Sequence, residues 1–249
     1  MKISIITSVY NNHETVAEAI GSVLSQTHPD IEYIIIDGGS TDGTVDIIKS
    51  YQNQVTQFIS EPDNGIYDGL NKGIKLATGD VIGFLHSDDL YEDNKVIEKV
   101  AQAFMNFGVD SVYGDLTYVD KANPAKIIRY WQSGDFSFNK LGYGWMPPHP
   151  TFFVKREIYE RYGLFDTSFK IAADYDLILR FLGKQKISTH YIPNVLIKMR
   201  VGGASNKSWR NILKKSQEDL QAMKNNSIGG MFGLLIKNFS KLPQFFRKA

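Results

Sequence analysis

Short apolar runs alternate with segments of helical spacing along the first third of the chain. Little polar alternation interrupts the runs, which is typical of strands buried on both faces; the runs are Ile3–Val9, Ile31–Ile36, Val55–Ser60 and Val81–Leu85. Between them, apolar residues recur three and four positions apart, which predicts helices over 13–26, Thr44–Tyr51 and Ile66–Ala77. This alternation predicts an α/β fold, with a Rossmann-like, mostly parallel sheet and helices on both faces.

The pattern is less regular from residue 86 onward. It predicts a helix near Tyr91–Phe104, a strand within Val109–Tyr118, loops over 121–148, helices at Glu157–Tyr162 and Tyr175–Leu182, and one or two edge strands in Thr189–Arg200. After Gly203 the spacing is helical to the end, apart from glycine and proline interruptions. We therefore divide the chain into two halves of one domain, 1–115 and 116–205, and a helical C-terminal extension, 206–249.

Charge and composition narrow the function. The 28 basic and 27 acidic side chains leave a net charge of +1, so bulk charge gives no reason to expect nucleic-acid binding. The chain has no cysteine, which excludes disulfides and leaves Asp, Glu or His as metal ligands. The N-terminal apolar run is too short for a signal peptide, and no stretch of about 20 apolar residues predicts a spanning helix. We therefore expect a cytoplasmic protein.

Polar residues, many of them aspartates, follow the ends of all four predicted strands. The four segments are Thr7–Asn11, Asp37–Asp42, Glu61–Asp63 and His86–Asp89. Ligands of parallel α/β sheets bind beyond the carboxyl ends of the strands. We therefore expect these segments to lie on one edge of the sheet and to form a binding site.

A glycine-rich loop, Asp37 through Thr44, follows the second predicted strand. Glycines let the backbone approach a ligand closely, and Ser40, Thr41 or Asp42 can cap the next helix. A capped turn without a ligand explains the loop equally well. The loop does not match Gly-x-Gly-x-x-Gly, and Gly-Lys-Ser/Thr does not occur in the chain, so the sequence predicts neither a dinucleotide site nor a P-loop.

Two adjacent carboxylates, Asp88 and Asp89, directly follow a predicted buried strand. Adjacent carboxylates repel each other, so a positive partner should offset them. Mg²⁺ or Mn²⁺ bound together with diphosphate oxygens would do so. The alternative is a solvated turn in which Asp89 caps the following helix.

Another two carboxylates, Asp174 and Asp176, open an apolar helical segment. Anionic side chains are stabilised near a helix N-terminus. Asp174 is therefore either a cap or a general base that takes a proton from an attacking hydroxyl. Asp176 is expected to pair with Arg180, four residues further along the helix.

Taken together, these segments occur in an order that resembles family 2 glycosyltransferases with a GT-A fold, over about residues 1–205. The matching segments are 4–11, 22–27, 32–44, 71–74, 77–80, 87–89 and 173–176, followed by Arg180. Each is weak alone, whereas their order and spacing are specific. The variant Asp-Gly-Gly-Ser-Thr-Asp-Gly-Thr, together with 63–68, resembles the branch that assembles bacterial surface polysaccharides such as O-antigen and capsule.

The resemblance implies that 1–115 is the half that binds a nucleotide-sugar donor. Thr7, Tyr10 and Asp37 match positions that line the nucleobase pocket, and Asn71 belongs with the donor-binding residues. Many family members carry a second Asp directly after the first, where this chain has Gly38. That departure puts the base contact, and uracil as the base, in doubt.

The resemblance also implies the reaction. Asp88 matches a position that contacts the ribose or the metal's surroundings, and Asp89 matches the ligand of the Mn²⁺ or Mg²⁺ that bridges the donor diphosphate. Asp174 matches the base of inverting members, in the half that binds the acceptor. A single displacement needs one base, whereas a glycoside hydrolase needs two carboxylates that flank the bond.

His149 and Arg200 are two further candidates for the nucleotide-sugar site. A lone histidine is more often structural, and the alternative for His149 is contact with a substrate. Arg200 could hold the diphosphate in a bidentate fork, or it could be an ordinary arginine at the end of a strand.

The sequence therefore predicts an inverting hexosyltransferase that moves a sugar from a nucleotide-diphospho-sugar, first of all a UDP-sugar, to a hydroxyl of a saccharide or lipid-linked saccharide. One alternative is a nucleotidyltransferase that makes sugar nucleotides, although such enzymes usually have a basic glycine-rich loop near the N-terminus. The other is a non-catalytic module that binds sugar nucleotides, which would have no need of a base at Asp174.

The C-terminal extension has a charge of its own. From Lys207 onward, nine Lys and Arg accompany only Glu218 and Asp219. On a helical wheel the apolar residues of 228–249 fall on one side and Lys237, Lys241 and Lys248 on the other. This pattern predicts either a peripheral helix at the inner face of the cytoplasmic membrane or a helix docked on the body or on a second copy in a homodimer.

Overall fold

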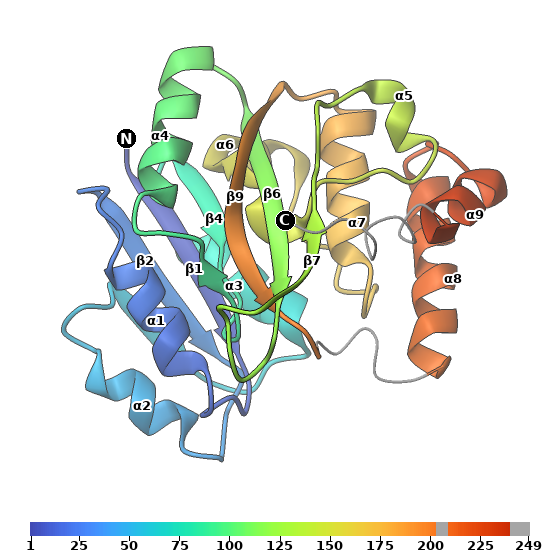
Figure 1. Ribbon diagram of the computed structural model, residues 1–249. Helices are drawn as coiled ribbons and strands as arrows, with labels where there is room; N and C mark the ends of the chain where they lie inside the picture. The colour runs from blue at the N-terminus through green and yellow to red at the C-terminus, as the bar shows by residue number, and fades with distance from the viewer. Residues whose placement is uncertain (203–208, 240–249) are drawn as a thin grey trace.

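The computed structural model describes residues 1–202 and 209–239, which form a sheet covered by helices on both faces (Figure 1). Its strands are β1 (Ile3–Val9), β2 (Ile31–Asp37), β3 (Gln57–Ser60), β4 (Val81–Phe84), β5 (Leu90–Tyr91), β6 (Ser111–Val119), β7 (Ile127–Trp131), β8 (Phe153–Lys155) and β9 (Thr189–Arg200). Its α-helices are α1 (Val16–Leu24), α2 (Thr44–Ser50), α3 (Ile66–Leu76), α4 (Val96–Phe107), α5 (Phe138–Leu141), α6 (Arg156–Tyr162), α7 (Ala173–Ile178), α8 (Trp209–Asn225) and α9 (Met231–Phe239). A 3₁₀ turn, η1 (His149–Thr151), precedes β8, and a π-helix, η2 (Leu179–Lys184), continues α7.

The strands lie in the order β3-β2-β1-β4-β8-β6-β9-β5, and β7 pairs with β6. The first four strands are parallel, as predicted, while β8 is antiparallel to both β4 and β6. The predicted edge position of 189–200 is wrong, since β9 is one strand between β6 and β5. Its apolar residues Ile192, Leu196 and Ile197 are buried, which places the strand inside the sheet. The segment 121–148, predicted as loops, also contains β7 and α5.

Two apolar cores lie on the two faces of the sheet. One contains Ile5, Ile20 and Val100, from β1, α1 and α4. The other contains Leu70 from α3 and Leu177 from α7, with Ala222, Met223, Ile228 and Leu234 from the C-terminal extension. Helices therefore cover both faces, as predicted, and the described part of the extension belongs to the same core as the body.

The helix α9 lies the opposite way round from the sequence prediction. Lys237 was expected on the polar face, but its side chain is 3% exposed and its Nζ lies 2.8 Å from Asp219 Oδ1. The apolar residues Met231, Phe232 and Leu235 are instead 50–70% exposed. Apolar periodicity alone could not reveal the buried partner of the lysine. The remaining residues of the predicted amphipathic segment, 240–249, lie outside the described residues.

A buried carboxylate, Glu32, joins the starts of three parallel strands. It accepts hydrogen bonds from Lys2 Nζ (2.8 Å) and Ser4 Oγ (2.6 Å) on the β1 side, and from the backbone N–H (2.7 Å) and hydroxyl (2.6 Å) of Thr78 before β4. Burial alone would raise the pKa of Glu32, but these hydrogen bonds lower it to about 2. The motif around Thr78 is therefore part of the scaffold.

We expect Glu32→Gln to lower the free energy of unfolding at pH 7 by about 2–3 kcal/mol, because a buried, hydrogen-bonded charge is lost. The folded-state pKa is depressed, so this contribution is present above the ordinary pKa of 4.5 and disappears as the pH falls towards 2. Urea unfolding at pH 7 and at pH 3 measures both effects. Glu157→Gln, in an exposed pair with Lys155, is the control and should change nothing measurable.

Candidate functional site

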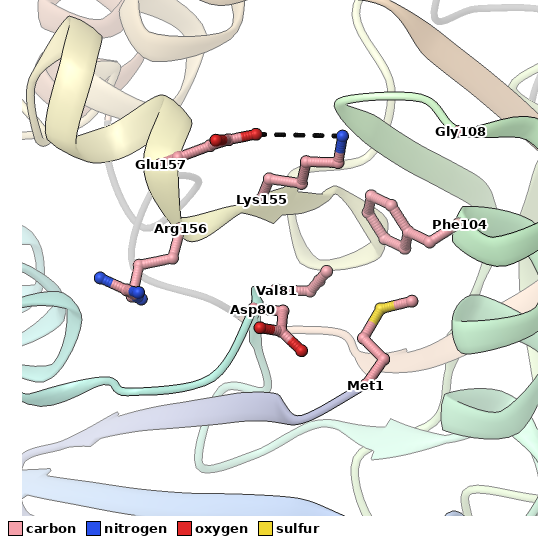
Figure 2. Close-up of a pocket in the computed structure, with 8 residues that line it drawn as sticks. All are labelled: Met1, Asp80, Val81, Phe104, Gly108, Lys155, Arg156 and Glu157. Atoms are coloured by element: carbon pink, nitrogen blue, oxygen red, sulfur yellow. Dashed lines mark ion pairs between the residues drawn. The ribbon is translucent and has the colours of Figure 1, made fainter.

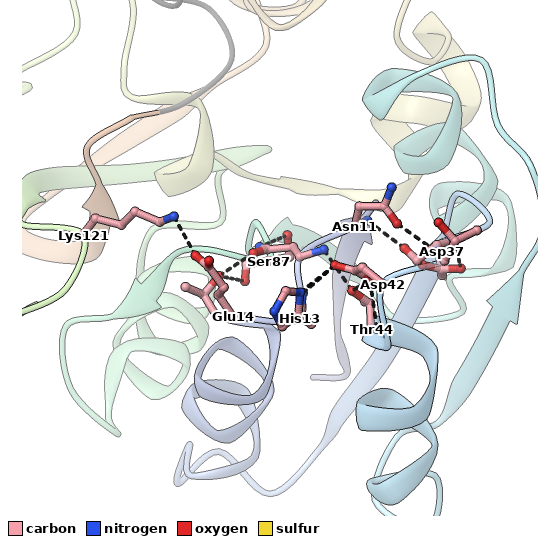
Figure 3. Close-up of polar contacts among 12 residues, drawn as sticks. Asn11, His13, Glu14, Asp37, Asp42, Thr44, Ser87 and Lys121 are labelled. Carbon is pink, nitrogen blue, oxygen red and sulfur yellow. Dashed lines mark hydrogen bonds and ion pairs between the residues drawn. The ribbon is translucent and has the colours of Figure 1, made fainter.

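The loops that follow the first strands meet at one edge of the sheet, as predicted. The loop after β1 is joined to the loop after β2, since Asn11 Oδ1 accepts the N–H of Thr41 at 2.8 Å. It is joined to the loop after β4 through Asn12 Nδ2, which donates to Ser87 Oγ at 2.8 Å. Figure 3 shows these contacts converging from the three loops. Parallel pairing is the reason, because it brings the carboxyl ends of the strands together.

Asp37 organises the glycine-rich loop from inside. It is fully buried, and its carboxylate accepts the N–H groups of Gly39 (3.1 Å) and Ser40 (3.0 Å) and the hydroxyl of Ser60 (2.7 Å). Gly39 has a φ of +84°, a left-handed conformation that favours glycine. The carboxylate expected to contact a nucleobase is thus already occupied by its own loop.

The place beside Gly38 is filled by a carboxylate from another loop. A Cβ added at Gly38 would lie 2.7 Å from Asp63 Oδ2. Asp63 is half-buried and follows β3. The sequence pattern of 63–68 predicts no role for Asp63, because only the fold shows that it adjoins Gly38.

Two further predicted donor residues turn out to be scaffold. Thr7 is fully buried, and its hydroxyl donates to Leu85 O at 2.8 Å. The Asn71 amide donates to Phe165 O (2.9 Å) and accepts from Phe165 N (3.0 Å), which ties α3 to the loop before α7. Neither side chain faces the loop edge with a free polar atom. Tyr10, in contrast, is 63% exposed there.

The two adjacent aspartates differ in their surroundings. Asp89 is 1% exposed, and its Oδ1 accepts the backbone N–H of Arg200 at 3.3 Å. Burial, together with the charge of Asp88, raises the pKa of Asp89 well above its usual value. Asp88 is only half-buried. The more accessible carboxylate is therefore Asp88, whereas the resemblance implies Asp89 as the metal ligand.

Arg200 holds this turn in place. Its guanidinium is almost entirely buried; it donates to Asp88 O (2.7 Å) and Lys121 O (3.1 Å) and pairs with Glu18. Of the two alternatives left open for Arg200, the contacts support the structural one. A guanidinium committed to two carbonyls and a carboxylate has little left to offer a diphosphate.

Asp174 is the second residue of α7. It is half-buried, and its Oδ1 accepts the N–H of Tyr175 at 2.8 Å and lies 3.3 Å from the hydroxyl of Tyr67 on α3. Burial lowers the pKa of His86, and the negative charges of Asp88 and Asp174 both oppose that shift. One imidazole thus lies close enough to both carboxylates to sense their charges.

His149 lies in the floor of this region. Its ring packs against Phe84, Phe165 and His86, with centroids 5.4–5.8 Å apart. It is 7% exposed, and neither ring nitrogen has a hydrogen-bond partner among the described residues. Burial lowers the pKa of His149 to about 4, so the ring is neutral at pH 7 and carries one unused donor and one unused acceptor.

The predicted pair of Asp176 and Arg180 is not formed. Asp176 Oδ1 instead accepts from Asn226 Nδ2 at 2.8 Å, and Arg180 donates to Leu164 O. The chain continues after α7 as the π-helix η2, which contains Arg180. Asn226, directly after α8, binds the Asp176 carboxylate in place of the arginine.

The residues at this edge fit a metal that arrives with a diphosphate. Within 1–202 and 209–239, no group of three or more Asp, Glu and His could hold a metal ion by itself. Asp88 offers carboxylate oxygens at the open edge, and Mg²⁺ or Mn²⁺ commonly completes its coordination with phosphate oxygens and water. A metal held by protein ligands alone does not fit.

A cavity of about 470 Å³ lies elsewhere, at the opposite edge of the sheet (Figure 2). It is lined by Met1, Asp80 and Phe104, among others, and by Lys155. The Lys155 ammonium faces the carboxylates of Asp110 (3.5 Å) and Glu157 (3.9 Å). None of the predicted site residues lines this cavity.

Within the same described residues, no helix has both the length and the apolar character needed to cross a membrane.

Comparison with known sequences identifies relatives of this chain. Residues 4–163 match the family described as Glycosyl transferase family 2. An uncharacterized glycosyltransferase of Nostoc sp. is 33% identical over 220 residues, which cover 83% of this chain and 66% of the relative. A PGL/p-HBAD biosynthesis glycosyltransferase of Mycobacterium bovis is 28% identical over 208 residues, which cover 82% of this chain and 78% of the relative.

Solved structures share the fold. S. aureus TarS in complex with UDP-GlcNAc superposes with a TM-score of 0.69 at 16% identity, over 91% of this chain and 66% of that chain. The mannosyltransferase PcManGT of Pyrobaculum calidifontis, in complex with GDP-Man and Mn²⁺, gives a TM-score of 0.69 at 19% identity, over 98% and 70%. The predicted GT-A fold is confirmed. This chain spans just under two thirds of the Nostoc relative and 44% of a longer TarS chain.

Proposed function

The chain belongs to glycosyltransferase family 2, and on that premise we propose that it transfers a sugar, with inversion, from a nucleotide-diphospho-sugar to a hydroxyl of a saccharide or lipid-linked saccharide. A UDP-sugar is the first donor to test, and bacterial surface-polysaccharide synthesis is the proposed setting. The observation that carries the proposal is the placement of Asp174. It lies half-exposed at the start of α7, with its Oδ1 3.3 Å from the hydroxyl of Tyr67 on α3.

The proposed reaction is a single displacement. Asp174 accepts the proton of the acceptor hydroxyl while that oxygen forms a bond to the anomeric carbon. The bond between the anomeric carbon and the diphosphate oxygen breaks, and both of its electrons leave with the nucleoside diphosphate. The hydroxyl of Tyr67, 3.3 Å from Asp174 Oδ1, helps to orient the base. One base on the acceptor face suffices for this reaction.

Donor binding is proposed to rest on three groups. Asp63, whose carboxylate adjoins Gly38, is proposed to take the role of the second Asp that many family members carry and to accept an N–H of the nucleobase. Asp88 is proposed as the protein ligand of a Mn²⁺ or Mg²⁺, which when bound would stabilise the charge on the departing diphosphate. The neutral ring of His149 offers a donor and an acceptor, a combination suited to a sugar hydroxyl.

Product analysis tests the proposed function directly. The full chain is incubated with Mn²⁺ and UDP-GlcNAc, UDP-glucose or GDP-mannose, and both the nucleoside diphosphate and pyrophosphate are measured. A glycosyltransferase releases nucleoside diphosphate, at a low rate to water and faster with a suitable acceptor. Pyrophosphate exchange would instead favour a nucleotidyltransferase, and binding without any turnover would favour the non-catalytic module.

We expect Asp174→Asn to reduce turnover by roughly 10²-fold or more, because the amide is nearly isosteric but cannot accept the proton. Donor affinity, measured by calorimetry, should be unchanged. Asp166→Asn, in the exposed loop before α7, is the matched control and should keep wild-type turnover. A loss of donor affinity in parallel with the rate would make Asp174 a donor-binding or structural residue.

Replacing each of the two adjacent aspartates in turn by asparagine separates their roles. We expect Asp88→Asn to abolish the gain in UDP affinity that Mn²⁺ gives, since an accessible ligand is lost. Asp89→Asn can still accept the N–H of Arg200 and removes a buried charge. It should therefore keep metal-dependent binding and should not unfold more easily. Calorimetry with Mn²⁺ and with EDTA measures this, and the reverse result would return the ligand role to Asp89.

Peripheral membrane contact through 228–249 and homodimer formation stay predictions. The exposed side chains of Met231, Phe232 and Leu235 give α9 an apolar surface of the kind that membrane contact requires. The sequence that follows carries Lys241, Arg247 and Lys248, which would be attracted to anionic lipid headgroups.

A further inference from the structure

The C-terminal extension reaches into the segment that carries the proposed base. From α8, the Glu218 carboxylate accepts hydrogen bonds from three successive backbone N–H groups, those of Lys170 (3.1 Å to each oxygen), Ile171 (2.8 Å) and Ala172 (3.0 Å). The side chain of Glu218 is only 12% exposed. These three residues directly precede α7, and Asp174 is the second residue of that helix.

The same segment is held from its other side by α3. The hydroxyl of Tyr67 donates to Ile171 O at 2.7 Å. The Ile171 residue is therefore fixed at its N–H by Glu218 and at its carbonyl by Tyr67, whose hydroxyl also lies 3.3 Å from Asp174 Oδ1. A shift of the segment would move the base relative to the Tyr67 hydroxyl beside it.

Two further contacts anchor the extension to α7, and an ion pair joins α9 to α8. Asn226 Nδ2 donates to Asp176 Oδ1 at 2.8 Å, and the Lys237 ammonium pairs with Asp219 at 2.8 Å and lies 3.0 Å from the centre of the Tyr175 ring. Burial alone would raise the pKa of Asp219, but the charges of Lys237 and Lys215 lower it. Figure 1 shows α8 beside α7, with α9 next to α8.

We propose that Glu218 is a positioning residue for the base, and that α8 and α9 are a working part of the active site. This inference rests on the proposed function of Asp174. Of the three N–H groups that donate to Glu218, those of Ile171 and Ala172 form partly buried hydrogen bonds, and unsatisfied buried donors are costly. Glu218 satisfies all three at once and so fixes where α7 begins.

A purely structural brace would stabilise the fold without affecting the geometry of the base. A positioning residue, in contrast, affects the rate of the chemical step. It leaves donor affinity unchanged, because the proposed donor site lies on the loops that follow β1 to β4. Misplacement of a reacting group by about 1 Å can cost on the order of 10²-fold in rate, and loss of a supporting contact typically costs 10- to 100-fold.

The test compares Glu218→Gln with wild type and with Glu160→Gln, an exposed glutamate paired with Arg156 on α6. We expect Glu218→Gln to lower kcat by roughly 10- to 100-fold, with the UDP-sugar Kd unchanged in calorimetry. Glu218→Asp, which keeps the charge on a side chain one methylene shorter, should recover part of the rate. Glu160→Gln should match wild type in both measurements.

Unchanged kcat in Glu218→Gln, while Asp174→Asn is inactive, would overturn the proposal and leave the proposed function standing. An equal loss of donor affinity and rate, or failure of both Glu218 variants to fold, would make Glu218 a residue of the fold alone and would also overturn it. If wild type releases no nucleoside diphosphate from any donor, the proposed function itself fails, and the two failures are thereby distinguished.

Discussion

Three carboxylates, those of Glu32, Asp37 and Glu218, are buried or nearly buried, and each accepts several hydrogen bonds. The positions of the loops around the site depend on these hydrogen bonds. A buried carboxylate is costly unless donors surround it, so each fixes the loop that supplies its donors. Glu32 fixes the starts of the parallel strands, Asp37 the glycine-rich loop, and Glu218 the entry to α7. Hydrogen bonds within the protein therefore hold these loops and strand ends in place.

Several motif residues hold neighbouring segments together and do not present free polar atoms at the open edge. The side chains of Thr7, Asn71 and Arg200 donate hydrogen bonds to backbone carbonyls of neighbouring segments. What remains partly exposed at the edge is a small set of carboxylates, Asp63, Asp88 and Asp174, while the ring nitrogens of His149, unpaired among the described residues, lie buried beneath it. Enzymes of this kind need a few groups held in place by many, since preorganised groups need not be reoriented at the moment of reaction.

The contacts of the C-terminal extension change how its basic composition is interpreted. Its basic composition and apolar periodicity predict a helix that contacts a membrane, the body or a second copy. In the structure, Lys237 pairs with Asp219 within the extension, and Asn226 donates a hydrogen bond to Asp176 of α7. The exposed apolar residues of α9 still offer a surface outside these contacts. The buried contacts and the exposed apolar residues lie on different faces of α9.

The sequence alone determined the strands and helices of the first half, the α/β class, the edge at which the loops meet, and Asp174 as the candidate base. The elements, the class and the edge follow from local periodicity and from the rule that parallel strands end together, both of which a linear pattern records. The role of Asp174 follows from its place in the motif order that resembles the family. The tertiary structure alone decided which carboxylates are buried and which are open, that Asp63 fills the place beside Gly38, and that Glu218 holds the segment before Asp174. Burial and contacts between residues tens of positions apart depend on how elements pack, and no local pattern of apolar and polar residues encodes that packing.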